Sequence, residues 1–102
     1  MSLSLQVLYP VADGTRFDYD YYLGSHMPLA DEKIGEHVRS MVVTRGVSGG
    51  PDQPPAYYAV ATMIFADQAA LDAALAAAGP VLDDIANFTD TAPRMLIGEV
   101  VA

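Results

Sequence analysis

Residues 17–29 read Phe-Asp-Tyr-Asp-Tyr-Tyr-Leu-Gly-Ser-His-Met-Pro-Leu, and the interpretation of the whole chain depends on this stretch. Asp18 is suited to be the N-cap of a helix, because its carboxylate can accept from backbone N–H groups of the first turn. On that helix Tyr22 and His26 are four residues apart, so their rings lie on the same side. Pro28 disfavours helical geometry in the residue before it, which predicts a break between two helical pieces at His26. The stretch therefore predicts a helix that brings phenols and an imidazole into one region.

Strand and helix patterns alternate along the rest of the chain. Strands are predicted over residues 3–9, 37–47, 57–65 and 93–101, which are rich in β-branched, aromatic and other apolar residues. Helices are predicted in two pieces up to Gly35, and over 68–78 behind the N-cap residue Asp67, with a further turn or two from Pro80 to Asn87. Residues 46–56, which are rich in Gly and Pro, are predicted to form a loop. The order β-α-β-β-α-β is that of a ferredoxin-like α+β fold with a four-stranded antiparallel sheet.

The composition limits the classes of protein to consider. The 102 residues suffice for one domain spanning 1–102. A net charge of −8, with only five Lys and Arg, argues against binding to nucleic acid or to an anionic membrane. The chain has no cysteine, its N-terminus lacks the pattern of a signal peptide, and no apolar run approaches the length of a membrane span. We therefore expect a cytoplasmic protein.

The third and fourth predicted strands carry apolar residues on both faces. Two helices can cover only one face of a four-stranded sheet, and a large bare apolar face is not expected on a soluble monomer. Packing two such sheets face to face would bury that surface. The sequence thus predicts a symmetric homodimer that forms through the sheet faces.

The pattern Phe17-Asp18-x-x-Tyr21-Tyr22-x-x-x-His26-x-Pro28-Leu29, preceded by Leu5-Gln6-Val7-Leu8-Tyr9-Pro10, resembles the EthD family, named for gene clusters of ethyl tert-butyl ether degradation. Members of that family are single small domains of about this length, so the resemblance covers nearly the whole chain. It implies a dimeric α+β barrel built from ferredoxin-like subunits. Small cofactor-free monooxygenases, muconolactone isomerases, and polyketide cyclases and decarboxylases share that fold. The family has no single agreed reaction, so the resemblance implies no particular substrate.

His26 is the first candidate for a catalytic residue, because an imidazole among aromatic side chains can exchange a proton near neutral pH. The alternative is a histidine that only caps the end of a helix. Tyr22, one turn away, is the candidate to hydrogen-bond or orient His26. Substrate-binding candidates are aromatic or cationic residues expected near the same region: Tyr9, Phe17, Tyr21, Arg39 and Tyr57. The alternative for Phe17 and Tyr21 is a place in the core. The alternative for Arg39 is a surface role or a salt bridge in the dimer.

Neither a metal site nor a nucleotide site is expected. His26 and His37 are the only histidines, they are not at metal-ligand spacing, and no thiolate is available. The glycine-rich loop at 46–50 lacks the Gly-Lys-Ser/Thr ending of a phosphate-binding loop. Asp83 and Asp84 are adjacent on a predicted helix and are interpreted as a solvated face. We therefore expect no cofactor.

These observations favour a small cofactor-independent enzyme that holds an apolar, aromatic or polyketide-like molecule between the first helix and the sheet. His26, assisted by Tyr22, would move a proton in a decarboxylation, isomerisation, dehydration or oxygenation. Two other interpretations stay open. One is a non-catalytic dimeric accessory protein that binds a hydrophobic small molecule or supports a partner oxygenase system. The other is a haem binder with His26 or His37 as axial ligand.

Overall fold

A computed structural model describes all residues 1–102. Four strands form one antiparallel sheet in the order β2-β3-β1-β4. The strands are β1 (Leu3–Pro10), β2 (Ser40–Arg45), β3 (Tyr57–Phe65) and β4 (Arg94–Glu99). The helical segments are α1 (Tyr19–Tyr21), the π-helical turn η1 (Tyr22–His26), α2 (Met27–Ile34), the 3₁₀ turn η2 (Gly35–His37), α3 (Gln68–Ala77), α4 (Gly79–Asp84) and the 3₁₀ turn η3 (Ile85–Asn87). This arrangement confirms the ferredoxin-like α+β prediction.

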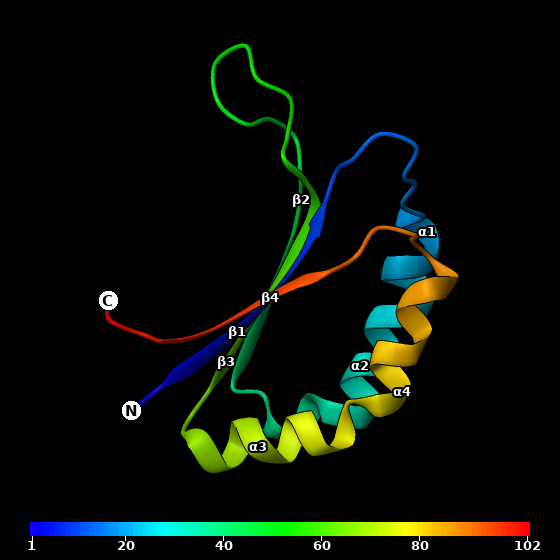
Figure 1. The fold of residues 1–102 in the computed structure, drawn as a ribbon. Helices are drawn as coiled ribbons and strands as arrows, with labels where there is room; N and C mark the ends of the chain where they lie inside the picture. The colour runs from blue at the N-terminus through cyan, green and yellow to red at the C-terminus, as the bar shows by residue number, and fades with distance from the viewer.

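All helices lie on one face of the sheet (Figure 1). Burial alternates along β1, so that Leu3, Leu5, Val7 and Tyr9 are buried under the helices while the residues between them are half-exposed. This is the two-residue period expected of a strand with one covered face. β3, in the middle of the sheet, alternates in the same way and ends at Phe65, which is fully buried. The core therefore lies between the sheet and the helices.

The opposite face of the sheet, which we call the outer face, has no covering element in this chain. Val42 of β2 is 63% exposed and Leu96 of β4 is 56% exposed on that face. Leu8, Val60 and Ile64, on the two central strands between them, are only partly buried. The outer face is therefore an apolar surface that is open to solvent in a single subunit.

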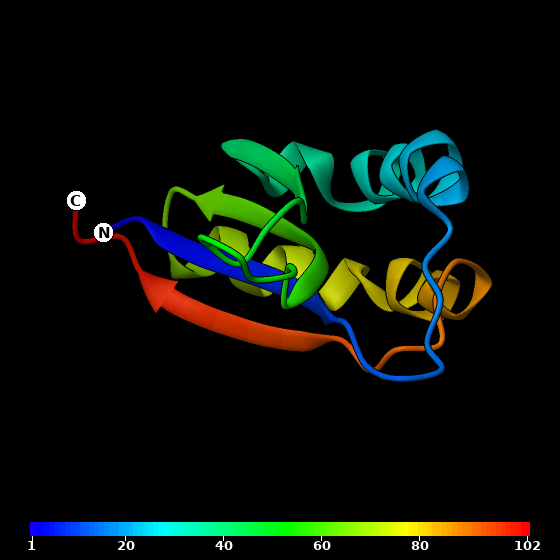
Figure 2. The same cartoon turned by 90° about the horizontal axis from the view of Figure 1, so that it is seen from above.

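The strand β4 is also poorly covered on the helix side. Figure 2 shows β4 at the edge of the sheet away from α2. Met95 and Ile97 pair with Val7 and Leu5, whose side chains lie on the helix side, yet both are about half-exposed. The helix layer thus leaves one side of the core open beneath this edge strand.

The first helical region does not break at His26, so that expectation is wrong. The segments α1, η1 and α2 follow one another without interruption, and the N–H of Met27 donates to the carbonyl of Tyr22, five residues earlier. Pro28 has no N–H to donate, and in a regular α-helix its ring clashes with the carbonyl four residues earlier. A π-helical turn is wider than an α-helical one and gives the proline room.

The predicted helix caps are confirmed, whereas two strands are shorter than predicted. Asp18 accepts from the N–H of Tyr21 at 3.1 Å, and Asp67 accepts from the N–H of Ala70 at 2.9 Å. β2 begins at Ser40, because η2 extends to His37 and two connecting residues follow it, and β4 spans Arg94–Glu99. No helix here has both the length and the apolar character required to cross a membrane.

Candidate functional site

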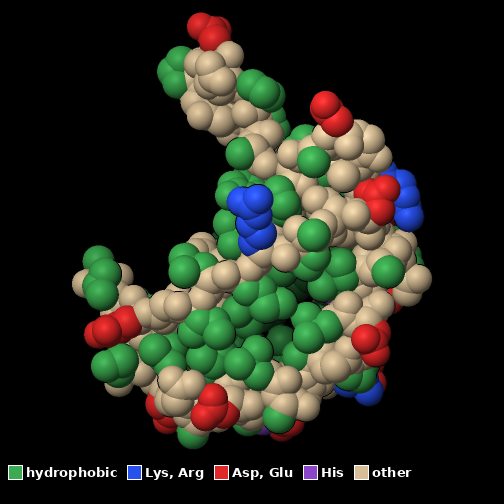
Figure 3. Space-filling view, in the orientation of Figure 1, with side chains coloured by type: hydrophobic (Ala, Val, Ile, Leu, Met, Phe, Trp, Pro, Cys, Tyr) green, Lys and Arg blue, Asp and Glu red, His purple; other side chains and the backbone are tan.

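A cavity with a volume of about 50 Å³ lies between the sheet and the helices. Strands β1, β2 and β3 contribute one side, and η1, α2, α4 and η3 contribute the other. Almost every lining side chain is hydrophobic, and the polar atoms at the wall belong to Tyr9, Tyr22 and His26. Figure 3 shows a hollow surrounded by hydrophobic side chains in this position. An apolar cavity with a few convergent polar groups is the usual form of a small-molecule site.

His26 lies on η1 and is held by a carboxylate from another helix. Its Nδ1 is 2.9 Å from Oδ2 of Asp84, the last residue of α4, and both side chains are largely buried. The other carboxylate oxygen of Asp84 accepts from the hydroxyl of Tyr21 at 2.7 Å and from the amide of Asn87 at 2.9 Å. Since an ionised carboxylate only accepts, the proton of a neutral His26 is on Nδ1, and Nε2 is left as an acceptor for a ligand.

The hydrogen bonds around Asp84 keep its carboxylate ionised. Burial raises the pKa of Asp84, but hydrogen bonds from Asn87, Tyr21 and His26 outweigh it and hold the pKa below its ordinary value. The same contact acts in reverse on Tyr21, because its hydrogen bond to the carboxylate favours the neutral phenol and raises the pKa of Tyr21. The interpretation of Asp84 as part of a solvated face was therefore wrong. Its side chain points inward and accepts hydrogen bonds from Tyr21, His26 and Asn87.

The hydroxyl of Tyr22 is the one buried side-chain polar atom without a hydrogen-bond partner. Tyr22 is 1% exposed, and its ring stacks on that of His26 with the centroids 5.6 Å apart. Burial raises the pKa of Tyr22 to about 12, so the phenol keeps its proton at neutral pH and can donate. Burial and the neighbouring Tyr22 phenol also raise the pKa of Tyr9. A buried polar group without a protein partner is rare, and this one is at the wall of the cavity, where a bound molecule or a water can satisfy it.

A cluster of aromatic rings holds these side chains in place. The ring of Phe88, which is fully buried, lies 4.5 Å from that of His26, 5.0 Å from that of Tyr22 and 5.6 Å from that of Tyr9. Most of these contacts are tilted or edge-to-face, the geometry that aromatic pairs prefer. Phe88 follows η3 and was not among the residues expected at the site, because no local pattern distinguishes it from an ordinary core residue.

The structure brings together only some of the residues predicted to form the site. Tyr9, Tyr22 and His26 line the cavity. Phe17 packs behind it, 5.0 Å from the ring of Tyr22, while Tyr21 reaches Asp84. These two residues support the cavity but do not line it.

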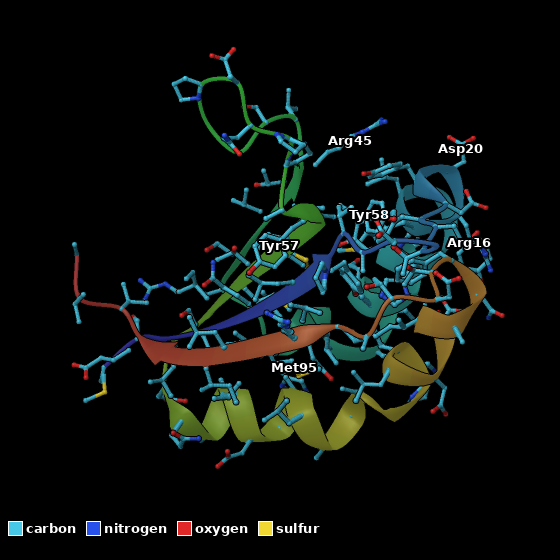
Figure 4. The ribbon with its side chains drawn as sticks, turned by 45° about the horizontal axis from the view of Figure 1, so that its top comes forward. Arg16, Asp20, Arg45, Tyr57, Tyr58 and Met95 are labelled. Carbon is cyan, nitrogen blue, oxygen red and sulfur yellow. The ribbon has the colours of Figure 1, made fainter.

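Arg39 and Tyr57, which were also predicted to contact a substrate, lie away from the cavity. Arg39 is exposed just before β2, and Tyr57 is half-buried at the start of β3. The arginine that approaches the first helix is Arg45, whose guanidinium lies 3.9 Å from the centre of the Tyr19 ring (Figure 4). This cation–π contact ties the end of β2 to α1.

Neither a metal ion nor a haem is suggested by the side chains present. No group of three or more His, Cys, Asp or Glu side chains is placed to hold a metal ion. Drug-sized ligands occupy sites of about 300–1,000 Å³, and a haem needs a site of at least that size. The cavity beside His26, at about 50 Å³, does not accommodate one as it stands.

Comparison with known proteins agrees with the fold and the motif. Residues 15–92 match the family model of the EthD domain. An EthD-like protein from Ralstonia eutropha JMP134 has a solved structure that superposes with a TM-score of 0.88 at 36% sequence identity, covering 99% of this chain and 93% of that one. A search of proteins with curated functions gave no match.

Two more distant structures share the fold alone. SnoaB, described as a cofactor-independent oxygenase from Streptomyces nogalater, has a TM-score of 0.68 at 11% identity, covering 99% of this chain and 94% of that one. A DABB family protein with a ferredoxin-like fold from Mesorhizobium loti has a TM-score of 0.63 at 16% identity, covering 99% of this chain and 98% of that one. The family model spans most of the chain, and the Ralstonia protein matches nearly all of it. This chain therefore belongs to the EthD family.

Proposed function

We propose that this protein binds a small apolar molecule carrying one polar oxygen and moves a proton on it through His26. The observation that carries the proposal is the unpartnered hydroxyl of Tyr22 beside an imidazole whose other nitrogen is held by Asp84. Tyr22 would donate to the ligand oxygen, and Nε2 of His26 would accept a proton from the ligand. The ionised Asp84 would stabilise the imidazolium that results.

Two classes of ligand can give up a proton to His26 in this arrangement: carbonyl compounds and phenols. With a carbonyl compound, His26 takes a proton from the neighbouring carbon, the C–H electron pair forms the enolate, and Tyr22 stabilises the negative oxygen. With a phenol, His26 takes the hydroxyl proton and leaves a phenolate. Isomerisation and dehydration can proceed through this enolate. In a decarboxylation the C–C bond breaks as CO₂ leaves, its electron pair forms the enolate, and a protonated His26 gives a proton to the carbon. Oxygenation of a phenol by O₂ can begin from the phenolate. SnoaB has the same fold and is described as a cofactor-independent oxygenase, which supports the last possibility by fold analogy only.

The test is a mass-spectrometric screen of the purified protein against small aromatic acids, phenols and lactones, with His26→Ala run in parallel. Product formation that is lost in the variant supports the proposal. Retention of a ligand without conversion, unchanged in the variant, supports instead a non-catalytic accessory protein that binds a hydrophobic molecule. A native protein that neither retains nor converts any compound of these classes contradicts the proposal.

We also propose that the protein is a homodimer that forms through the outer face of the sheet. Val42 and Leu96 are exposed there at opposite edges, with partly buried apolar residues of β1 and β3 between them. A second copy placed on this face by a two-fold axis would cover the same residues on both subunits. The fold similarity to a DABB, or dimeric α+β barrel, family protein supports this arrangement.

A further inference from the structure

A second depression, a groove with a volume of about 420 Å³, lies directly beside the cavity. It runs along α4 and η3 to the segment that precedes β4, and its apolar part consists of Leu82, Ile85, Ala86 and Pro93. Leu82 and Ile85 also line the cavity. These two side chains are therefore the wall that the cavity and the groove share.

The cavity alone is too small for a complete ligand. An apolar cavity of about 150 Å³ holds a benzene molecule, whereas this one measures about 50 Å³. An aromatic head that enters it must displace part of the wall. Most of that wall belongs to the sheet and to buried helix residues, but Leu82 is 44% exposed. A shift of this side chain would join the cavity to the groove without disturbing the core.

We propose that the groove is the second half of the same binding site and takes the uncharged tail of the molecule whose polar head reaches Tyr22 and His26. This inference rests on the proposed function, because it assumes that the head occupies the cavity. It adds the shape and charge of the substrate: an elongated molecule with one polar oxygen at its buried end and no anionic group at the other.

The residues that line the groove disfavour an anionic tail, and Arg16, whose N–H donates to Asp90, is exposed and does not line the groove. None of the residues that line it is Lys, Arg or His, and Asp90 places a carboxylate there. Arg94, the first residue of β4, pairs with Leu8, so its side chain lies on the outer face. The chain as a whole carries a formal charge of −8. A carboxylate or phosphate in the groove would lose water and meet a like charge.

The polar side chains of the groove are already engaged with the protein. The hydroxyl of Thr89 donates to the carbonyl of Arg16 at 2.6 Å, and that of Thr91 donates to the carbonyl of Pro10 at 2.6 Å. Oδ1 of Asp90 accepts from the N–H of Arg16 at 2.9 Å. The threonine hydroxyls are thus not free to donate to an anion. The surface available to a tail is mainly apolar.

Three ligands with the same head test this inference by isothermal titration calorimetry at neutral pH. They are phenol, 4-pentylphenol, and 5-(4-hydroxyphenyl)pentanoic acid, which replaces the end of the pentyl tail with a carboxylate. We expect 4-pentylphenol to bind the native protein at least about tenfold more tightly than phenol, because the tail buries apolar surface in the groove. The acid should bind about tenfold more weakly than 4-pentylphenol or worse, because its carboxylate lies beside Asp90.

Two variants and one matched control assign the effect to the groove. Ala86→Trp fills the groove at a residue that does not line the cavity, and it should bring the affinity for 4-pentylphenol down to that for phenol in the same variant. Circular dichroism and thermal unfolding show whether the variant is folded. Ala76→Trp places the same ring on an exposed position of α3 that lines neither depression, and it should keep the native order of affinities. Asp90→Asn should strengthen binding of the acid several-fold and leave 4-pentylphenol unchanged.

The outcomes separate this inference from the proposed function. Equal affinity of the native protein and Ala86→Trp for 4-pentylphenol would overturn the groove as tail site, and so would tight binding of the acid. If phenol binds and only the tail effects are missing, the proposed function stands and the inference fails. If none of the three ligands binds the native protein, the inference is overturned, whereas the proposed function is decided by the wider screen, which also contains lactones.

Discussion

Nδ1 of His26 lies 2.9 Å from Oδ2 of Asp84, although 58 positions separate the two residues along the chain. The contact joins η1 to α4, and Tyr21 and Asn87 hold the same carboxylate from two further directions. An imidazole positioned by a carboxylate in this way presents its other nitrogen as an acceptor. Asp84 is thus the positioning residue for His26.

The first prediction concerns the tautomer of His26. In the native protein at a pH where the imidazole is neutral, the proton should be on Nδ1, because only that nitrogen faces the carboxylate of Asp84. Asp84→Asn should give a mixture of tautomers or the opposite one, since an amide can donate as well as accept. The ¹⁵N chemical shifts of the imidazole report the tautomer directly. Asp83→Asn, at the exposed neighbouring position, is the control and should leave the spectrum unchanged.

Acid stability should depend on Asp84. The pKa of Asp84 in the folded protein lies below the ordinary value of 3.8, because three hydrogen-bond donors favour the ionised form. The group therefore stabilises the fold at pH values above its unfolded pKa, and this contribution is lost as the pH falls through the folded pKa. Urea unfolding of the native protein between about pH 5 and pH 2 should show a steeper loss of stability than unfolding of Asp84→Asn. Parallel curves for the two proteins would contradict this assignment, and Asp83→Asn should follow the native curve.

Removal of the Tyr22 hydroxyl should have opposite effects on stability and on binding. The hydroxyl is buried without a partner, so Tyr22→Phe should raise the free energy of unfolding of the ligand-free protein by about 1 kcal/mol. The same change should weaken binding of a phenol by about tenfold, because one donor to the ligand oxygen is lost. Tyr19→Phe is the control, since its hydroxyl donates to the carbonyl of Tyr58 at 2.9 Å and its loss should destabilise the fold by about 1 kcal/mol. A destabilised Tyr22→Phe with unchanged affinity would show that this hydroxyl has no ligand.

Turnover of any substrate identified in the screen should depend on His26. His26→Gln should lower the rate by about 100-fold or more, because a positioned acid or base contributes about 10²–10⁴-fold to catalysis. His37→Gln changes the other histidine, which is half-buried on η2 beside Glu36, and should keep the native rate. Full activity in the first variant would remove His26 from the reaction.

The oligomeric state should respond to a charge on the outer face. Leu96→Glu places a carboxylate at an exposed apolar position of that face, and burying it between two sheets is costly. Sedimentation at micromolar concentration should give a dimer for the native protein and a monomer for this variant. Leu75→Glu, on an exposed position of α3 away from the outer face, should remain dimeric. A native protein that sediments as a monomer would overturn the proposed dimer.

Local patterns in the chain were enough for the fold and for part of the site. The two-residue alternation of β1, the N-cap residues Asp18 and Asp67, and the spacing between Tyr22 and His26 all act over a few residues, so the sequence alone reveals them. The motif around His26 also indicated the family, which the match over residues 15–92 confirms. The roles given to His26 and Tyr22 remain predictions.

The partner of His26, the π-helical turn beneath it and the groove beside the cavity depended on tertiary structure. Asp84 looks like a solvated residue in the sequence because helical spacing says nothing about which of two adjacent carboxylates will face another helix. The packing of α4 and η3 against η1 and α2, which buries the apolar core on the sheet, decides which of the two carboxylates faces His26. The turn widens at η1 because Pro28 must fit into a continuous helix. Short-range periodicity determines which elements form, whereas contacts between residues far apart in the chain exist only after those elements have packed together.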